Sequence, residues 1–237
     1  MKEILKRESL FYKFYLYYDL YIKHKSFIRK KSYSQHGEDL FINEYFQNKA
    51  GGFYVDIGCF HPLKYNNTYL LYKKGWSGMN IDMNQTSIDL FNINRPKDSN
   101  ICCALSNEEK KVVAYIDHYF SPVNTINKNY SDFAEKNISF RTHNKSYIET
   151  RTFDTLVRND KITVPKIDFL NIDAEGSDYE VLEGFNLSKY RPGFICVEML
   201  NISFEDRNKN KKTLDYLNTK GYNLIKNLGP NGIFKLK

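Results

Sequence analysis

A short apolar run that ends in an acid and a glycine, Phe53–Gly58 (FYVDIG), constrains the fold of this chain more than any other segment. Such a run is typical of a buried parallel strand, and a glycine after it lets the backbone turn sharply beside a ligand. A second apolar run ends in Asp82, 26 residues after Asp56. This spacing is typical of a nucleotide-binding unit, in which the second acid accepts hydrogen bonds from ribose hydroxyls. We therefore expect the chain to bind an adenosine-type cofactor.

The remaining apolar segments predict the rest of a sheet. Two more buried strands are expected to end in acids, at Asp173 and Glu198, and predicted helices separate the strands. Further strands are expected at Asn100–Leu105 and, as a pair, at Val112–Ile116 and Tyr147–Phe153. The chain closes with two short strands around a Gly-Pro-Asn-Gly turn at 229–232, the pattern of a hairpin. The sequence thus predicts an α/β fold: a Rossmann-like, mostly parallel sheet of seven strands with a C-terminal antiparallel hairpin, flanked by helices.

The positive charge of the chain is concentrated at its start. The net charge is +7, and residues 1–32 hold nine Lys and Arg residues against three acids, which leaves about +1 for the rest. A nucleic-acid surface is therefore not expected. Apolar residues recur at helical spacing from Ile4 to Ile22, so residues 1–32 are predicted to form a basic amphipathic helical segment. A length of 237 residues suits a single further domain, 33–237.

Three roles of residues 1–31 stay open. The segment is expected to pack on the domain or on a second copy of the chain, to lie on an anionic membrane surface, or to dock another partner while poorly ordered. No signal peptide and no apolar run of membrane-spanning length is visible. We expect a cytoplasmic protein, with the inner face of the membrane as the alternative location.

The segment 117–146 is polar and lacks a clear hydrophobic period. A segment of this length in a compact domain is usually a lid or a binding loop. Arg141 and His143 are candidates for binding a phosphate or another anionic part of a substrate, because a guanidinium binds phosphate with two hydrogen bonds.

Several motifs together resemble the FkbM family of class I S-adenosylmethionine-dependent methyltransferases. They are SQHGED at 34–39, YVDIG at 54–58, Asn67-Thr68, GWSG at 75–78 and NIDAEG at 171–176. The resemblance covers about residues 33–200 and implies O-methylation of a sugar or related natural product. The chain departs from the family pattern at His61, and the loop after Phe53–Gly58 offers one glycine instead of two or three. A pyrophosphate needs closer backbone approach than such a loop gives, whereas S-adenosylmethionine carries no phosphate.

The resemblance implies a site for S-adenosylmethionine. Its expected residues are Gln35, Glu38, Asp56, Gly58, Asn67, Thr68, Asp82, Ala104 and Ser106. Asp82 would accept both ribose hydroxyls, since a carboxylate has two acceptor oxygens. Asp56 and Gly58 would line the methionine part, and Asn67 and Thr68 would begin a helix that faces its carboxylate. Glu38 would close over the cofactor, while the resemblance implies the adenine beside Ala104 and Ser106.

Methyl transfer to a sugar hydroxyl benefits from a general base. Asp173, at the end of a predicted strand, is the first candidate for this base or for a metal ligand, and His61 is the second candidate base. Asp173 and Glu198, with Glu175 nearby in sequence, would offer oxygen ligands to Mg²⁺ or Mn²⁺. Each acid also has an ordinary structural role as a cap or a surface group.

Two other classes of function compete with the methyltransferase. One is an NAD-dependent sugar oxidoreductase or epimerase, against which the missing G-x-G-x-x-G motif and the terminal hairpin speak. The other is a non-catalytic glycan-binding module. The expected partner in the leading hypothesis is a small sugar or nucleotide-sugar that leads to a surface glycan, such as a capsular or lipopolysaccharide precursor.

Overall fold

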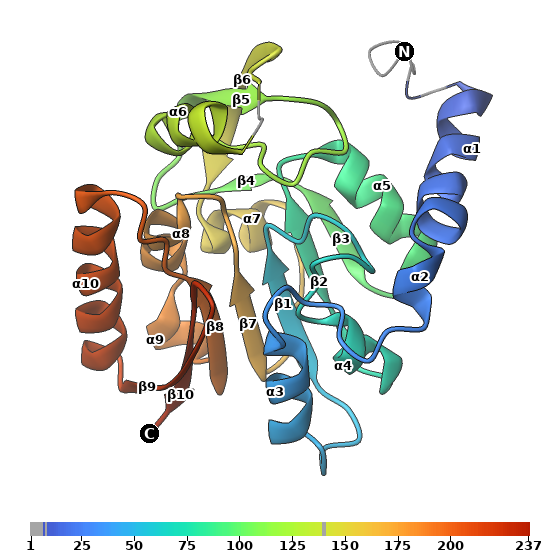
Figure 1. The fold of residues 1–237 in the computed structure, drawn as a ribbon. Coiled ribbons are helices and arrows are strands. Elements are labelled where there is room, and N and C mark those ends of the chain that lie inside the picture. Colours follow the sequence, from blue (N-terminus) through green and yellow to red (C-terminus); the bar gives the residue numbers. More distant parts are fainter. Residues whose placement is uncertain (1–6, 8, 139–140) are drawn as a thin grey trace.

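The structure is a computed structural model that describes residue 7, residues 9–138 and residues 141–237, with the exception of the side chain of Phe204. Its centre is a sheet of seven strands in the order β3-β2-β1-β7-β8-β10-β9 (Figure 1). These strands are β1 (Phe53–Ile57), β2 (Ser77–Asp82), β3 (Ser99–Cys102), β7 (Phe169–Ile172), β8 (Phe194–Glu198), β9 (Tyr222–Leu228) and β10 (Asn231–Leu236). β10 runs antiparallel to both β8 and β9, whereas the other pairs are parallel. The predicted mostly parallel sheet with a C-terminal antiparallel hairpin is confirmed.

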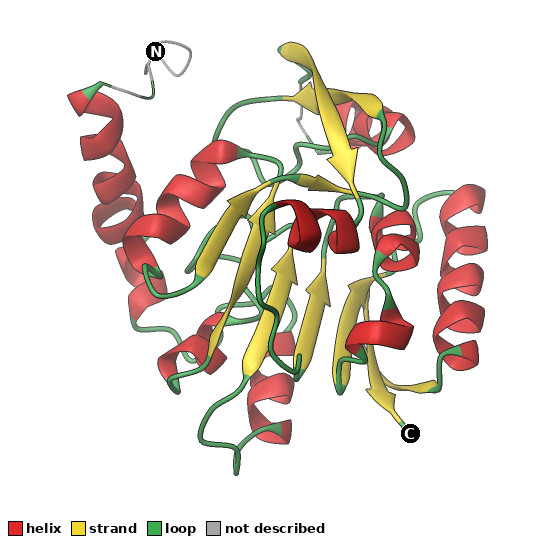
Figure 2. Cartoon of the chain, turned by 180° about the vertical axis from the view of Figure 1, so that it is seen from behind, coloured by secondary structure: helices red, strands yellow, loops and turns green. Residues whose placement is uncertain are grey.

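Helices cover both faces of this sheet (Figures 1 and 2). The helices are α1 (Leu10–Tyr18), α2 (Lys25–Ile28), α3 (Glu38–Tyr45), α4 (Tyr69–Lys73), α5 (Gln85–Asn94), α6 (Lys128–Asn137), α7 (Phe153–Asn159), α8 (Asp178–Gly184), α9 (Leu187–Tyr190) and α10 (Phe204–Thr219), with a π-helix at Asp19–Lys23. Successive side chains of a strand point to opposite faces. Tyr54 accordingly packs in a cluster with Ile42 of α3, while Val55 packs in the cluster that contains Val181 of α8. Burial on both sides explains why the strands are near-continuous apolar runs.

A small second sheet stands above the main one, with strand order β4-β6-β5. Its strands are β4 (Ala104–Leu105), β5 (Lys111–Ile116) and β6 (Asn144–Arg151), and β5 pairs antiparallel with β6. The expected pairing of these two segments is confirmed. The single strand expected at Asn100–Leu105 is wrong, because the chain leaves the main sheet after Cys102 and Ala104 pairs with Thr150 of β6 instead.

Two further expectations need correction. The polar segment 117–146 is not a plain loop, since it contains α6, which begins at the cap Asn127. The helix expected over residues 1–31 is broken in the described part into α1, a π-helix at Asp19–Lys23 and α2. The prediction for residues 1–6 and 8 lies outside the described residues. No helix in the described ranges is long and apolar enough to cross a membrane.

Candidate cofactor and acceptor site

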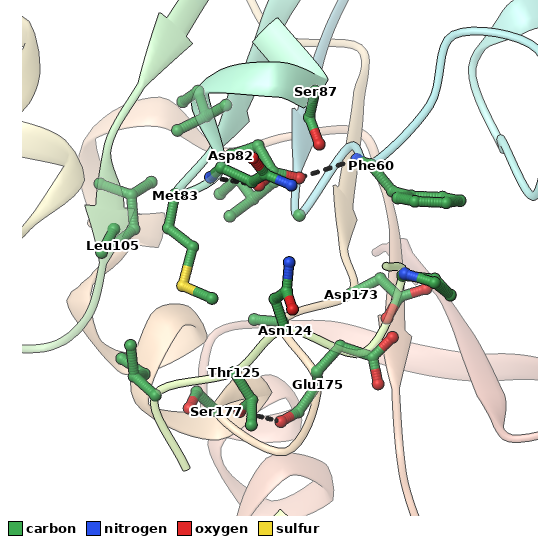
Figure 3. A pocket seen from close by; sticks show the side chains of 18 of the residues that line it. Phe60, Asp82, Met83, Ser87, Leu105, Asn124, Thr125, Asp173, Glu175 and Ser177 are labelled. Carbon is green, nitrogen blue, oxygen red and sulfur yellow. Dashed lines mark hydrogen bonds between the residues drawn. The ribbon is translucent and has the colours of Figure 1, made fainter. Parts of the chain in front are cut away.

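A cavity opens at the carboxyl ends of β1, β2 and β7, where the strand order reverses. Open α/β sheets bind their ligands at this point. Of the residues predicted for the site, six line the cavity: Gln35, Gly58, Asp82, Ala104, Asp173 and Glu175. Lining residues that the sequence did not single out include Phe60, Tyr65, Met83, Asn84, Asn124, Thr125 and Ser177. Asp82 lies toward one end and Asp173 with Glu175 toward the other, with Asn124 between them (Figure 3).

Gly58 is required by the close approach of two strands. Its φ is +73°, in the left-handed region, and a Cβ atom there would lie 1.7 Å from the carbonyl oxygen of Asp173. Its own amide donates to the Ile81 carbonyl at 2.8 Å. The turn after β1 is thus packed against the ends of both neighbouring strands, which fixes the floor of the cavity.

Asp82 is held from two sides at the end of β2. Its Oδ2 accepts from the Phe60 amide at 2.8 Å, and its Oδ1 accepts from the Asn84 amide at 2.7 Å. A carboxylate oxygen has two lone pairs, so each oxygen keeps one acceptor site for a hydroxyl. Burial raises the pKa of Asp82 to about 6, which still leaves it ionised at neutral pH. The side chain is therefore oriented and charged to accept hydrogen bonds from a vicinal diol.

An apolar wall lies beside Asp82. Met83 follows it directly, and Ala104 and Leu105 of β4 line the same cavity (Figure 3). A flat heteroaromatic ring could pack against Met83, Ala104 and Leu105, and the soft thioether of methionine suits such a contact. The position of Met83 immediately after the predicted ribose acid is a signal that sequence reasoning could have used.

Three lining residues have strained backbones. Phe60, Tyr65 and Glu175 have φ values of 49°, 54° and 50°, in the left-handed region that non-glycine residues rarely occupy. Such conformations cost of order 1–3 kcal/mol and persist where the surrounding structure fixes them. Thr125 fixes one of them, since its hydroxyl donates to the Glu175 carbonyl at 2.8 Å. Several strained backbone conformations around one cavity are typical of a functional site.

Acidic groups gather at the other end of the cavity, where Asp173 and Glu175 line it and Glu198 lies next to them but outside the lining. Asp173, Glu175 and Glu198 each place a carboxylate oxygen within 4.8 Å of the others. Burial raises the pKa of Asp173 and of Glu198 well above their ordinary values, and it raises the pKa of Glu175 to about 8. Asp178 lies under this group and caps the turn, accepting from the Ala174 amide at 2.6 Å and the Gly176 amide at 3.1 Å. Burial and mutual repulsion therefore favour the protonated forms of these neighbouring carboxylates, and a bound cation would favour their ionised forms.

The predicted metal ligands have a suitable donor set. Oδ1 of Asp173 and Oε2 of Glu198 are buried and have no hydrogen-bond partner in the described structure. Carboxylate oxygens are the ligands that Mg²⁺ and Mn²⁺ prefer. Asp173, Glu198 and Glu175 would therefore be the residues that hold such an ion.

Asp56, Asn67 and Thr68 do not line the cavity, although the sequence placed them at the cofactor. They are buried beneath it, where Asp56 accepts from the Thr68 hydroxyl at 2.8 Å and from Asn171 at 2.9 Å. Asn67 donates to Asn171 Oδ1 at 2.9 Å. Thr68 does precede α4, but its side chain does not cap that helix. These residues lie beneath the cavity and connect the ends of β1 and β7.

Two more predicted cofactor residues lie outside the lining. Glu38 is buried and accepts from the His36 amide at 2.8 Å and from Asn231 Nδ2 at 2.6 Å, so it ties the segment before β1 to β10. Ser106 is buried beyond β4, next to Asn107. Gln35, in the same motif as Glu38, is exposed and does line the cavity.

His61 is buried behind Phe60 and does not line the cavity. Its Nδ1 accepts from the amides of Leu63 at 3.0 Å and Lys64 at 3.1 Å, so the proton sits on Nε2, 3.4 Å from Asp19 Oδ1. Burial lowers the pKa of His61. A general base must reach the proton that it takes, and this geometry instead joins the loop after β1 to the N-terminal segment.

Asp19, His24 and His61 also bring possible metal-ligand atoms within 4.8 Å of one another. A neutral histidine that binds a metal through Nε2 carries its proton on Nδ1. In His61 this nitrogen already accepts two backbone amides. The hydrogen bonds therefore disfavour a metal at this cluster.

The predicted anion-binding residues do not line the cavity. Arg141 and His143 are both exposed and absent from its lining, and His143 Nε2 is 3.6 Å from Asp117 Oδ1. Another part of the same segment does cover the cavity, namely residues 121–126. Asn127, which follows residues 121–126, links them to the loop before α8, because its Nδ2 donates a hydrogen bond to the Gly176 carbonyl at 2.5 Å.

The fold and the site define a class I methyltransferase-like domain, and comparison with known proteins assigns the family. Residues 47–224 match the Methyltransferase FkbM domain, so the chain belongs to the FkbM methyltransferase family. No curated protein matches the chain. The crystal structure of methyltransferase FkbM from Methylobacillus flagellatus KT at 2.20 Å resolution is similar, with 12% identity and a TM-score of 0.46 over 78% of this chain and 44% of that chain. The present chain thus spans less than half the length of that protein.

Proposed function

We propose that the chain is an S-adenosylmethionine-dependent O-methyltransferase that acts on a sugar hydroxyl. The observation that carries the proposal is the pair Asp82 and Asp173, which face one cavity from the ends of β2 and β7. In this proposal Asp82 would accept hydrogen bonds from the ribose diol, and Asp173 would face the methyl acceptor. The family assignment supports methyl transfer as the class of reaction.

The residues of the cavity suit the parts of this cofactor. Asp82 would hold the ribose hydroxyls through charge-assisted hydrogen bonds, and Met83 and Leu105 would flank the adenine. Gln35 and the backbone at Gly58 would contact the methionine part. The bound cofactor would supply a methyl group on a sulfonium, which is already a good leaving group, so the enzyme mainly has to position the acceptor.

Asp173 is the proposed general base. Burial raises its pKa well above the ordinary value, so the ionised form of Asp173 would be a strong base toward a hydroxyl, and the positive charge of a bound sulfonium would favour that ionised form. Asp173 would take the proton of the sugar hydroxyl while the oxygen bonds to the methyl carbon and the S–CH₃ electron pair stays on sulfur. The products would be the methylated sugar, the cofactor as a neutral thioether and protonated Asp173, so atoms and charge are conserved.

The acidic end of the cavity favours a neutral sugar over a phosphate-containing carrier. In the absence of a bound cation, ionised Asp173 or Glu175 would repel a phosphate, and Arg141 and His143 do not line the cavity. We infer that a neutral sugar enters the cavity while any nucleotide or lipid carrier stays outside it. A surface-glycan precursor is the proposed source of such a sugar, and a nucleotide-sugar is the second one to test.

A divalent cation on Asp173 and Glu198 is a separate part of the proposal. Mg²⁺ or Mn²⁺ there would relieve the repulsion between the carboxylates and would acidify a bound hydroxyl. Glu175 would complete the ligand set. Addition of Mn²⁺ to metal-stripped protein should then raise the affinity for the acceptor sugar.

An NAD-dependent reaction finds less support. After Gly58 the chain runs to Tyr69 before a helix begins, so no helix N-terminus follows β1 closely enough to bind a pyrophosphate. Calorimetric titration of the protein with S-adenosylmethionine, and separately with NAD, decides between the two. We expect micromolar affinity for S-adenosylmethionine alone. Binding of NAD alone would overturn the proposal, and binding of neither would favour a non-catalytic module.

A further inference from the structure

The N-terminal helical segment, residues 9–31, exposes an apolar face. Phe11 is 77% exposed, Phe14 64% and Ile22 60%. Leu10, Tyr17, Tyr18 and Tyr21 are also large exposed apolar residues. At 100° per residue the residues of α1 among them fall within an arc of about 120°. We call this surface, made of Leu10, Phe11, Phe14, Tyr17, Tyr18, Tyr21 and Ile22, the outer face.

The opposite face fixes the segment to the domain. Tyr12, Leu16 and Leu20 are buried in a cluster with Leu63 and Leu90. The Tyr12 hydroxyl donates to Asp89 Oδ2 at 2.8 Å, and Asp19 is buried beside His61. The segment therefore cannot roll over to bury its outer face on its own domain. Figure 1 shows α1 and α2 along one side of the molecule, with the outer side of α1 uncovered by other described elements.

Exposed cations accompany this apolar face along the segment. Lys13 and Lys25 are exposed, and an exposed cluster of Arg29, Lys30 and Lys31 ends the segment. The acid in residues 9–31, Asp19, is buried and paired with Lys23 at 2.5 Å. Aromatic rings with flanking lysines and arginines are typical of helices that lie in the headgroup region of a membrane. Each such cation adds attraction to a negatively charged lipid surface.

We propose that the outer face is a docking surface for an anionic membrane. The proposal is independent of the methyl transfer. A second copy of the chain is the less favoured occupant, because a symmetric contact would bring two strongly basic segments together. An anionic bilayer instead complements the charge and takes up the exposed phenylalanines at the same time. Contiguous apolar surface of this kind on a domain usually marks an interaction site.

Co-sedimentation of the full chain with lipid vesicles tests the proposal. We expect binding to phosphatidylcholine–phosphatidylglycerol vesicles, no binding to phosphatidylcholine alone, and weaker binding at high salt. The double substitution Phe11→Ser/Phe14→Ser should lower the vesicle partition coefficient about tenfold, since two exposed apolar groups are lost. Tyr147→Ser is the matched control, because Tyr147 is 70% exposed on β6.

A charge variant tests the contribution of the basic cluster that ends the N-terminal segment. Arg29→Glu/Lys31→Glu should abolish binding, whereas Lys136→Glu/Lys226→Glu, on α6 and β9, should retain most of it. All variants alter exposed side chains, so their thermal unfolding should match the parent. Absence of vesicle binding, or binding that ignores lipid charge and both N-terminal variants, would overturn the proposal. A dimer that Phe11→Ser/Phe14→Ser dissociates, without vesicle binding, would assign the surface to a second copy instead.

Discussion

The buried carboxylate of Asp56 and the buried guanidinium of Arg95 are joined through one hydroxyl. Thr68 Oγ1 donates to Asp56 Oδ2 at 2.8 Å and accepts from Arg95 Nη1 at 2.8 Å. Arg95 is fully buried and also donates to Asn66 Oδ1 at 2.7 Å and to the Pro62 carbonyl at 2.8 Å. The guanidinium thereby holds the loop between β1 and α4 and balances the charge of Asp56 beneath the cavity.

Arg95→Met should destabilise the protein by about 3–5 kcal/mol, because it leaves Asp56 as an uncompensated buried charge and several acceptors without a donor. Urea unfolding gives the free energy difference. Arg158→Met removes an exposed arginine from α7 as the control and should change stability by less than about 0.5 kcal/mol. Equal stabilities of the two variants would show that the network contributes little.

Asp82→Ala should weaken the binding of S-adenosylmethionine by about 1–3 kcal/mol through loss of charge-assisted hydrogen bonds. Titration calorimetry measures the affinity, and Glu109→Ala, which removes an exposed acid, is the control for the change in net charge. An affinity equal to that of the parent would rule out the ribose role of Asp82.

The raised pKa of Asp82 also predicts that the affinity for S-adenosylmethionine depends on pH. The pKa of Asp82 is raised to about 6 by burial, and only its ionised form accepts hydrogen bonds with both oxygens. Affinity for S-adenosylmethionine should therefore be full above this pKa and fall as the pH drops through about 6. The affinity of Asp82→Ala should lack this decline, and a decline of the same size in the variant would assign it to another group.

Asp173→Asn should lower kcat by about 10²–10⁴-fold while the affinity for S-adenosylmethionine stays near that of the parent, because an amide cannot accept the hydroxyl proton. The two quantities are measured by turnover with an acceptor sugar and by calorimetry. The companion variant Glu198→Gln separates the role of Asp173 as a base from its role as a metal ligand. It removes one proposed metal ligand and leaves the proposed base in place. Turnover of Asp173→Asn close to the parent level would remove this residue from the mechanism.

Glu175→Gln should stabilise the folded protein more at pH 8 than at pH 5. The pKa of Glu175 is raised to about 8 by burial, so between about pH 4.5 and 8 the folded state binds more protons than the unfolded state. In this window the stability of the parent falls as the pH rises, and the variant lacks that loss. Urea unfolding at both pH values measures the difference, with Glu109→Gln as the exposed control. A stability difference that does not grow with pH would contradict the burial of this charge.

Much of the fold follows from local sequence. The runs Phe53–Ile57 and Phe194–Glu198 are strands as expected, because an apolar run flanked by glycine carries its own signal. The split after Cys102 was missed, since Ala104 leaves the main sheet only to pair with Thr150, which lies far along the chain. The helix α6 was missed because its sequence is polar, and it is stabilised by packing of Tyr130 and Ala134.

The site was predicted less completely than the fold. The acidic residues at the carboxyl ends of the strands show the reason. The sequence by itself determined that Asp56, Asp82 and Asp173 stand at the ends of buried strands, because hydrophobic runs and turns are properties of neighbouring residues. Only the tertiary structure decided that Asp82 and Asp173 face the cavity while Asp56 lies under it with Arg95. The side chain of Asp56 shares the face of Tyr54 in β1, and which helices cover that face depends on contacts between distant segments.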